Sequence, residues 1–401
     1  MSNTNELINK VDQYGAHNYL PLPVVLTRGE GSKVWDVEGK EYLDFLSCYS
    51  ALNFGHQHPR LTKALVTQMG KLSLCSRAFH NDQLAEFSQE LADFTGLDSV
   101  LPMNSGAEAV ETALKLARKW GSQVKGVPIN EAKIVVMKNN FHGRTITIIS
   151  FSSEEGYREG FGPFTPGFIE AEFDDVSALE AVLDDKCVGV LMEPIQAEAG
   201  ILIPKEGYLT EVKSLCQKKN ILFILDEIQT GLGRTGKDFC FQHEDATPDI
   251  LILGKSLGGG LLPISAAVSR KEVMDVMGPG EHGSTFGGNP LACAVAREAM
   301  RVLKGEQLSL RSAEMGAKVM DRLHSQPLPK VKEVRGKGSL IGIEMDPSAG
   351  GARRYCEELA SRGVLCKETH EHVIRIAPPL NIPENELLEG VERIIQVIQR
   401  G

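Results

Sequence analysis

Short apolar runs alternate with longer amphipathic segments through the middle of the chain. The apolar runs, rich in β-branched residues, cover residues 133–137, 188–192, 221–225 and 250–253, and helix-like segments cover 107–120, 176–183 and 208–219. Short strands that alternate with helices predict an α/β domain built on a mostly parallel sheet. A further strand-like run, 264–269, follows with no helix before it, so we expect it to run antiparallel.

The pattern changes from about residue 305. A helix is predicted over 306–325, a strand–turn–strand over 331–345, a strand over 373–377 and a last helix with an apolar stripe from Leu387 to Ile398. These elements indicate a smaller α+β domain. A hairpin is predicted around 33–43, with Glu38-Gly39 at the turn. We therefore expect an N-terminal segment (1–50) that packs with the small domain and the active site, a large domain (51–290) and a C-terminal small domain (291–401).

Composition narrows the class of protein. The 401 residues are 42% hydrophobic and carry a net charge of −10, which argues against a nucleic-acid-binding surface. The N-terminus has no apolar targeting segment and no apolar run reaches membrane length, so we expect a cytoplasmic protein. Eight cysteines lack any C-x-x-C spacing, which favours reduced thiols over disulfides or a zinc site.

Two predicted neighbouring strands end in residues that can do chemistry. The strand 221–225 is followed by Asp226 and Glu227, and the strand 250–253 by Gly254 and Lys255. In open α/β sheets the ligand crevice lies at the carboxyl ends of the strands. A lysine held among apolar neighbours has a lowered pKa and becomes a better nucleophile. Taken singly, each acid fits a helix cap or surface turn equally well, and a solvated strand-end lysine is the better interpretation of Lys255.

A third feature is the start of the helix at 107–120. Ser105 and Glu108 have the spacing of a capping box, and Gly106 permits close backbone approach. A helix start is an anion site, although an ordinary capped helix fits this segment as well. Together, an anion cradle, a strand-end carboxylate and a strand-end amine are the three groups that pyridoxal phosphate needs.

Two other motifs suggest different functions. Residues 231–237 nearly match a nucleotide-binding P-loop, but Asp238 stands where Ser or Thr would bind magnesium, so an ATPase is disfavoured. His56 and His58 could begin a metal site. No Cys or acidic residue lies near them in the sequence, so a polar turn is the better interpretation.

Motifs along nearly the whole chain resemble those of the class III aminotransferases, within the fold-type I pyridoxal-phosphate enzymes. They lie at residues 14–23, 47–53, 76–80, 141–145, 193–200, 226–231, 282–285 and 373–379. The resemblance implies that Lys255 bonds covalently to the cofactor and later shuttles a proton. Asp226 would pair with the pyridine nitrogen, Gln229 would contact the ring hydroxyl and Phe141 would stack on the ring.

The resemblance also implies how the phosphate is held. Gly106 and Ala107 would donate backbone N–H groups to it, next to Ser105. Ser284 and Thr285 would reach the phosphate of the other subunit, so the active sites would be shared in a homodimer.

The class members most similar in these motifs imply a substrate pair, L-ornithine and 2-oxoglutarate. Arg144 would bind the ornithine carboxylate, assisted by Tyr19, while Tyr49 would shape the pocket. Arg375 would bind the α-carboxylate of 2-oxoglutarate, and Glu198 would mask Arg375 when ornithine is bound. Without the resemblance, ordinary salt bridges would be the better interpretation of Arg144, Glu198 and Arg375.

The sequence departs from the family pattern at Ala197, where Gly is usual, and at Ser105, where Thr is frequent. The added methyl of Ala197 could restrict Glu198. N-acetylornithine and 4-aminobutyrate are alternative amino donors within the class, and a fold kept for binding without chemistry is a third possibility. Intact Lys255 and Asp226 argue against the last.

Overall fold

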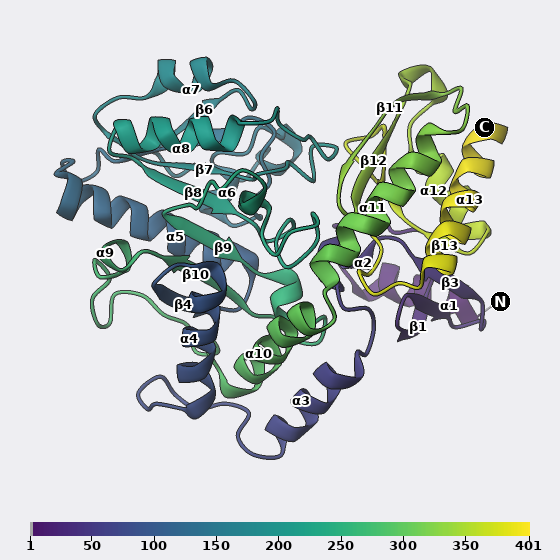
Figure 1. Cartoon of the computed structure of the whole chain (residues 1–401), viewed down its shortest axis with the longest axis horizontal. Helices are drawn as coiled ribbons and strands as arrows, with labels where there is room; N and C mark the ends of the chain where they lie inside the picture. Colours follow the sequence, from purple (N-terminus) through teal and green to yellow (C-terminus); the bar gives the residue numbers. More distant parts are fainter. Residues whose placement is uncertain (1–2) are drawn as a thin grey trace.

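The structure, a computed structural model, describes residues 3–401. Its main element is a seven-stranded sheet in the order β4-β10-β9-β8-β7-β5-β6, in the left half of Figure 1. The strands are β4 (Ser99–Met103), β5 (Lys133–Met137), β6 (Phe168–Ala171), β7 (Cys187–Met192), β8 (Leu222–Asp226), β9 (Ile250–Leu253) and β10 (Ser265–Ser269). Strand β10 is antiparallel to both of its neighbours, and the other pairings are parallel. The predicted α/β fold with one antiparallel strand is confirmed.

Helices cover both faces of this sheet, so its strands are apolar on both sides. In β8, Leu222 and Ile224 pack in the cluster that contains the buried side of α5 (Gly106–Trp120). Phe223 and Leu225 point to the opposite face and pack with α8 (Tyr208–Lys218). Successive side chains of a strand alternate between faces, which explains the division.

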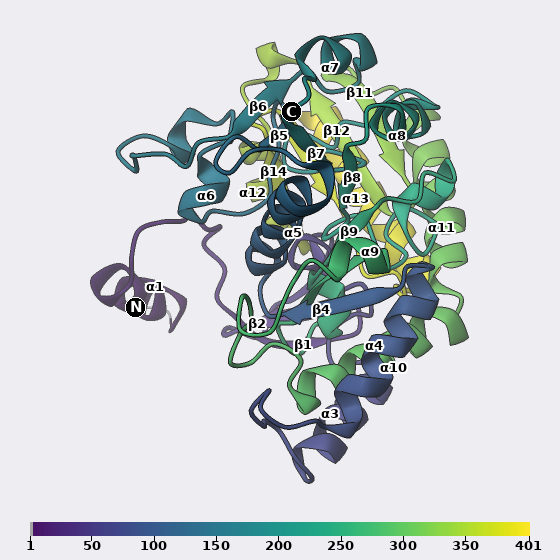
Figure 2. The same ribbon diagram turned by 90° about the vertical axis from the view of Figure 1, so that its left-hand side faces the viewer.

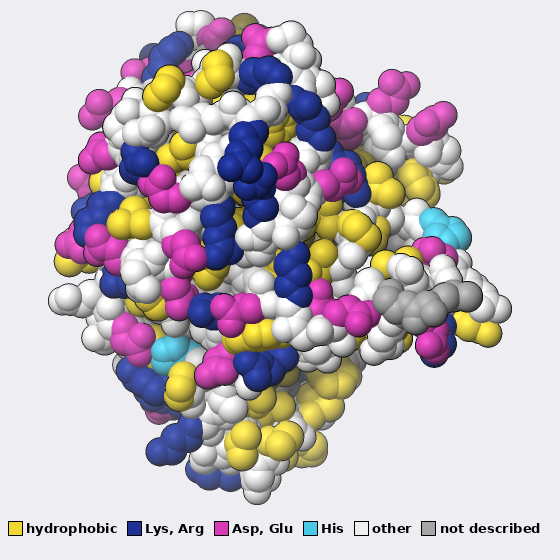
Figure 3. Space-filling view, turned by 90° about the vertical axis from the view of Figure 1, so that its right-hand side faces the viewer, with side chains coloured by type: hydrophobic (Ala, Val, Ile, Leu, Met, Phe, Trp, Pro, Cys, Tyr) yellow, Lys and Arg dark blue, Asp and Glu magenta, His cyan; other side chains and the backbone are white. Residues whose placement is uncertain are grey.

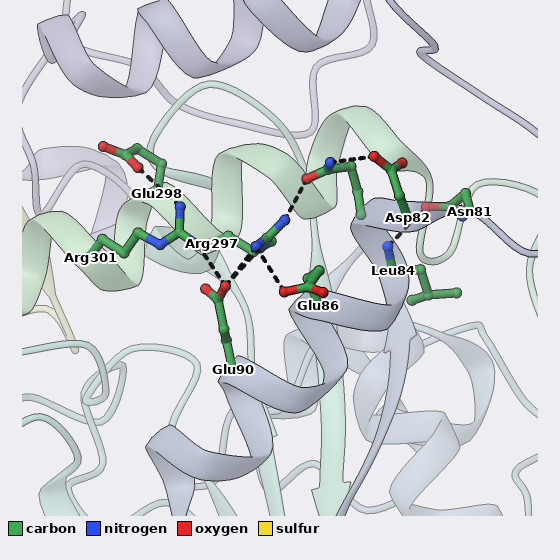
Figure 4. A network of polar contacts seen from close by, with 9 residues as sticks. Asn81, Asp82, Leu84, Glu86, Glu90, Arg297, Glu298 and Arg301 are labelled. Carbon is green, nitrogen blue, oxygen red and sulfur yellow. Dashed lines mark hydrogen bonds and ion pairs between the residues drawn. The ribbon is translucent and has the colours of Figure 1, made fainter.

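Helix α10 (Pro290–Gly305) lies near the bottom of the large unit in Figure 1. The remaining helices of this unit are α3 (Pro59–Met69), α4 (Asp82–Thr95), α6 (Ile146–Ile149), α7 (Val176–Val182), α9 (Lys271–Met274) and α10 (Pro290–Gly305). Arg297 and Arg301 of α10 share the Glu90 carboxylate of α4, at 2.7 and 2.6 Å (Figure 4). The buried residues of α10 belong to the core of the large sheet. We therefore propose that the domain division lies after α10, rather than at residue 291.

The smaller unit, on the right of Figure 1, contains an antiparallel sheet in the order β11-β12-β15-β14. Its strands and helices are β11 (Val331–Lys337), β12 (Leu340–Met345), β14 (Lys367–Thr369), β15 (Val373–Ile376), α11 (Leu308–His324), α12 (Arg353–Ser361) and α13 (Glu384–Arg400). The apolar stripe of α13 packs with β12, β15 and α12 in one core.

A third sheet combines three strands from the N-terminal part of the chain with one strand from the C-terminal part. It contains β1 (Leu26–Glu30), β2 (Lys33–Asp36), β3 (Glu41–Asp44) and β13 (Val364–Leu365), in that order. The predicted hairpin is β2–β3, whose turn includes Gly39 with φ +85°. Because β13 pairs with β3, and Leu43 and Phe45 lie in the small-unit core, residues 26–45 pack with the C-terminal part.

Helix α1 (Asn3–Tyr14) has no buried residue and projects from the body (Figure 2). On the face drawn in Figure 3, cationic and anionic side chains are interspersed, and hydrophobic side chains gather beside the projecting segment. Among residues 3–401, no helix is long and apolar enough to cross a membrane.

Candidate active site

A cavity lies where β8 and β9 end and α5 begins. Its lining includes Gly106, Ala107, Phe141, Asp226, Gln229 and Lys255, which are six of the residues that the sequence singles out. His142, Gly143, Glu193, Ile195, Ile228 and Thr230 complete it. The tertiary structure thus brings the predicted amine, carboxylate and helix start to one place. It is the crevice expected at the carboxyl ends of parallel strands.

The two adjacent carboxylates at the end of β8 point in opposite directions. Asp226 continues the row of Leu222 and Ile224 and lines the cavity. Glu227 turns to the other side, where its oxygens accept the N–H groups of Cys240 (2.6 Å) and Phe241 (2.8 Å). Burial raises the pKa of Glu227 to about 7. Asp226 is therefore the acid available to a ligand, and Glu227 supports the fold.

Asp226 has a buried histidine partner. His142 Nδ1 lies 2.7 Å from Asp226 Oδ2, and the backbone N–H of Ile228 donates to Asp226 Oδ1 at 3.0 Å. Since an ionised carboxylate only accepts, the geometry assigns the proton to Nδ1. The other imidazole nitrogen, Nε2, is buried and has no partner in residues 3–401. The sequence places His142 beside Phe141 but does not reveal this pairing.

A second acid, Glu193, also lines the cavity. Its Oε2 accepts the backbone N–H of Phe141 at 3.0 Å, which holds the aromatic residue in place. Burial and the nearby Asp226 raise the pKa of Glu193 well above its ordinary value. A raised pKa favours the protonated form of Glu193, which avoids a second negative charge next to Asp226.

Lys255 follows β9 with a left-handed φ of +46°. Burial lowers the pKa of its amine to about 8, although the nearby carboxylate of Glu198 opposes the shift. A larger fraction of this amine is neutral near pH 7 than for a solvated lysine. Such an amine can attack an aldehyde and can later accept a proton.

The start of α5 has the predicted capping box. Ser105 accepts the N–H of Glu108, and Glu108 Oε2 accepts the N–H of Ser105 at 2.6 Å. The N–H groups of Gly106 and Ala107, in the first turn, have no intrahelical acceptor, and such N–H groups can bind an anion. A Cβ at position 106 would lie 2.8 Å from Ile228 Cδ1, so any larger residue there would have to displace the end of the Ile228 side chain.

Glu198 and Arg375 form an ion pair that is linked to the cavity through Gln229. Arg375 Nη1 donates to Glu198 Oε1 at 3.0 Å, and Gln229 Nε2 donates to the same oxygen at 3.0 Å. Burial would raise the pKa of Glu198, but the Arg375 charge outweighs it and lowers that pKa to about 2. Arg375 also donates to Ala197 O (3.0 Å) and Thr369 Oγ1 (3.1 Å).

Tyr49 lies in a strained turn, α2 (Ser47–Ser50), beside this pair. Its four residues all have left-handed φ values, between 46° and 72°, which costs roughly 1–2 kcal/mol per residue. The Tyr49 ring centroid lies 5.2 Å from the Arg375 guanidinium. Backbone strain of this kind clusters at ligand-binding sites in proteins.

Arg144 is exposed, whereas Arg375 is buried. Its guanidinium lies 5.9 Å from the rings of Tyr19 and Phe141 and 4.4 Å from the ring of Tyr157. Within the described chain it forms no ion pair with a carboxylate. Neither Arg144 nor Arg375 lines the cavity itself: Arg375 is paired with Glu198, whereas Arg144 has no carboxylate partner among residues 3–401.

The remaining predicted residues flank the cavity. Ser105 lines a neighbouring hollow with Gly106 and Lys255. Ser284 Oγ accepts a hydrogen bond from Asn104 Nδ2 at 2.7 Å, and Thr285 is exposed. Neither Ser284 nor Thr285 lines the cavity of its own chain.

The P-loop-like segment has a structural role instead. Arg234 within it is fully buried and donates to Asn53 Oδ1, Ser339 O and Pro378 O, which connects the large and small units. His56 pairs with Asp44 at 2.9 Å and His58 with Glu306 at 3.2 Å. No cluster of three or more potential metal ligands is present among residues 3–401.

Comparisons with known proteins agree with this geometry. Residues 14–398 match the family model "Aminotransferase class-III". The chain is 54% identical to an ornithine aminotransferase of Brevibacillus brevis, with 99% of each chain covered. The solved ornithine aminotransferase of Toxoplasma gondii superposes with a TM-score of 0.98 at 46% identity, covering 100% of this chain and 96% of that one. The acetylornithine aminotransferase of Elizabethkingia anophelis has a TM-score of 0.90 at 47% identity, with both chains covered fully.

Class-III aminotransferases use pyridoxal phosphate. The cavity fits this cofactor, because it presents an amine with a lowered pKa, a buried carboxylate and a helix start. Buried polar atoms without partners in residues 3–401, His142 Nε2 and Gln229 Oε1, belong to two of its lining residues. The chain belongs to the class-III aminotransferases.

Proposed function

We propose that the enzyme transfers the δ-amino group of L-ornithine to 2-oxoglutarate, giving glutamate 5-semialdehyde and glutamate. The observation that carries this proposal is the different state of the two arginines. Arg375 is paired with Glu198 beside Lys255, whereas Arg144 is open at the exposed side. A donor that reacts through its distal amine needs its carboxylate bound away from the lysine, and Arg144 supplies that cation.

Pyridoxal phosphate, when bound, supplies an electron sink for the carbon that carries the reacting amine. Lys255 would hold the cofactor covalently and then carry the proton to and from that carbon. Asp226, fixed by His142, would accept a hydrogen bond from the pyridine N–H and favour the protonated ring. Phe141 would cover one ring face, Gln229 would contact the ring hydroxyl, and Gly106 and Ala107 would donate N–H groups to the phosphate, next to Ser105.

The two substrates require different states of one pocket. With ornithine bound, Glu198 would neutralise Arg375, and Arg144 with Tyr19 would hold the carboxylate, while Tyr49 limits the space. With 2-oxoglutarate bound, Glu198 would turn away and Arg375 would bind the α-carboxylate. An arginine–carboxylate pair that opens for one substrate and closes for the other gives specificity to both half-reactions.

We propose that the active enzyme is a homodimer, in which Ser284 and Thr285 reach the phosphate in the partner. Large apolar side chains near the site are exposed in the single chain, including Phe286 (55%) and Phe79 (71%). Phe286 also lines an apolar hollow with Leu74 and Leu262, beside Asn104. A second copy would cover these surfaces. A cytoplasmic location remains a prediction from the N-terminal composition.

The experiment compares three amino donors with 2-oxoglutarate: L-ornithine, N-acetyl-L-ornithine and 4-aminobutyrate. We expect kcat/KM to be highest for ornithine and the product to be the cyclised semialdehyde, identified by mass spectrometry. Faster turnover of N-acetylornithine would reassign the donor. No turnover of any donor, with no cofactor colour that ornithine bleaches, would contradict an aminotransferase.

A further inference from the structure

Tyr157 is the residue that contacts Arg144 most closely. Its ring centroid lies 4.4 Å from the guanidinium carbon, and its hydroxyl accepts a hydrogen bond from Arg144 Nη2 at 3.3 Å. No other hydrogen bond of the Arg144 side chain is found in the described chain. Tyr157 is half-buried in a short 3-10 turn, η2 (Glu155–Tyr157), and lies outside the motifs from which the site was predicted.

The same tyrosine also contacts the residue expected to cover the cofactor. Its ring meets the ring of Phe141 edge-on, with centroids 6.1 Å apart and planes at 72°. Tyr157 thus bridges Phe141 and Arg144, which are three positions apart in the chain. An exposed arginine without a carboxylate partner otherwise samples many rotamers, and fixing it before binding removes that entropic cost from the affinity.

We infer that Tyr157 is a positioning residue that holds the Arg144 guanidinium in the orientation that binds the carboxylate of the amino donor. The ring keeps the cation over its face, and the hydroxyl fixes the rotation of the planar fork. This inference rests on the proposed function, because it assumes that Arg144 binds that carboxylate. It identifies Tyr157 as a determinant of donor affinity that does not itself touch the reacting atoms.

The experiment measures the first half-reaction, the ornithine-dependent loss of cofactor colour, in the holoenzyme. In Tyr157→Leu we expect the apparent Kd or KM for ornithine to rise about 10-fold, a size typical of a lost cation–π contact and hydrogen bond. The limiting rate and the spectrum before ornithine is added should stay within about twofold, because the cofactor contacts remain. Tyr157→Phe keeps the ring and should recover most of the affinity.

A matched control comes from the same segment. The ring of Phe164 lies 4.8 Å from the guanidinium carbon of Arg158, so Phe164→Leu removes an arginine–aromatic contact in the same segment that does not involve Arg144. This variant should keep the affinity for ornithine. An equal loss in Phe164→Leu would show that general order of residues 155–164 is responsible, and would overturn the inference.

A double-mutant cycle tests whether Tyr157 acts through Arg144. In an Arg144→Met background the further change Tyr157→Leu should alter ornithine affinity by less than twofold. An undiminished 10-fold loss in that background would overturn the inference. The proposed function fails separately, if the unmodified enzyme does not react with ornithine at all.

Discussion

The Glu198 carboxylate and the Arg375 guanidinium are 3.0 Å apart, and the arginine side chain is almost completely buried, with 2% of its surface exposed. A buried cation that loses its only carboxylate partner becomes a strong site for an external carboxylate. Under the proposed function, the pair would control which substrate carboxylate can bind next to Lys255.

Removing the mask should change donor preference. In Glu198→Ala, Arg375 is free to bind the α-carboxylate of glutamate, so glutamate becomes a better donor. We expect the ratio of kcat/KM for ornithine to kcat/KM for glutamate to fall at least about 10-fold, the effect of one charge-assisted pair. Steady-state kinetics with each donor measure the ratio.

The control for this variant is Glu333→Ala, which removes an exposed partner of Arg335 in β11. It should leave the ratio unchanged. An unchanged ratio in Glu198→Ala would contradict the masking role.

The neighbouring acids Asp226 and Glu227 should give opposite phenotypes. Asp226→Ala removes the cavity carboxylate, so we expect kcat/KM to fall by roughly 100-fold or more, as when one preorganised electrostatic group is lost. Glu227→Ala leaves the N–H groups of Cys240 and Phe241 unpaired, at a cost of about 1–3 kcal/mol in unfolding free energy for each buried group. Activity per folded molecule should change little in Glu227→Ala.

Urea unfolding and activity assays on the same preparations separate the two effects. Loss of activity without loss of stability in Glu227→Ala would contradict the assignment of Glu227 to the fold.

Capture of the cofactor should depend on pH through Lys255. Only the neutral amine attacks an aldehyde, and burial lowers the pKa of this amine to about 8. Below pH 8 the rate at which apoenzyme regains cofactor colour should rise about tenfold per pH unit, and above pH 8 it should level off. A free lysine derivative, with its pKa near 10.4, should keep accelerating up to about pH 10.

If the apoenzyme rate instead kept increasing up to pH 9, as the rate of the free lysine derivative does, the pKa of Lys255 would not be lowered. Lys255→Ala provides the second check, since it should bind cofactor only weakly and complete no turnover.

Several features were predictable from the sequence because they depend on local chemistry. The apolar runs predict the strands of the sheet, and the absence of a helix before residues 264–269 predicts the antiparallel β10. The capping box of Ser105 and Glu108 forms as its spacing requires. Some elements were not predicted. Strands β4 and β6 are short and have mixed polar and apolar residues, so their sequences resemble loops. Helix α10 falls at the start of the segment that was assigned to the small domain.

Tertiary structure decided which of the adjacent residues face the site. Because β8 is apolar on both faces, its alternation cannot tell which face α5 covers, so the pattern alone leaves Asp226 and Glu227 equivalent and only the family resemblance singles out Asp226. The pairings of His142 with Asp226 and of Tyr157 with Arg144 join residues 84 and 13 positions apart and depend on side-chain packing. The sequence by itself determined the residue types and the strand ends that carry them, whereas only packing decided their partners, their burial and hence their charge states.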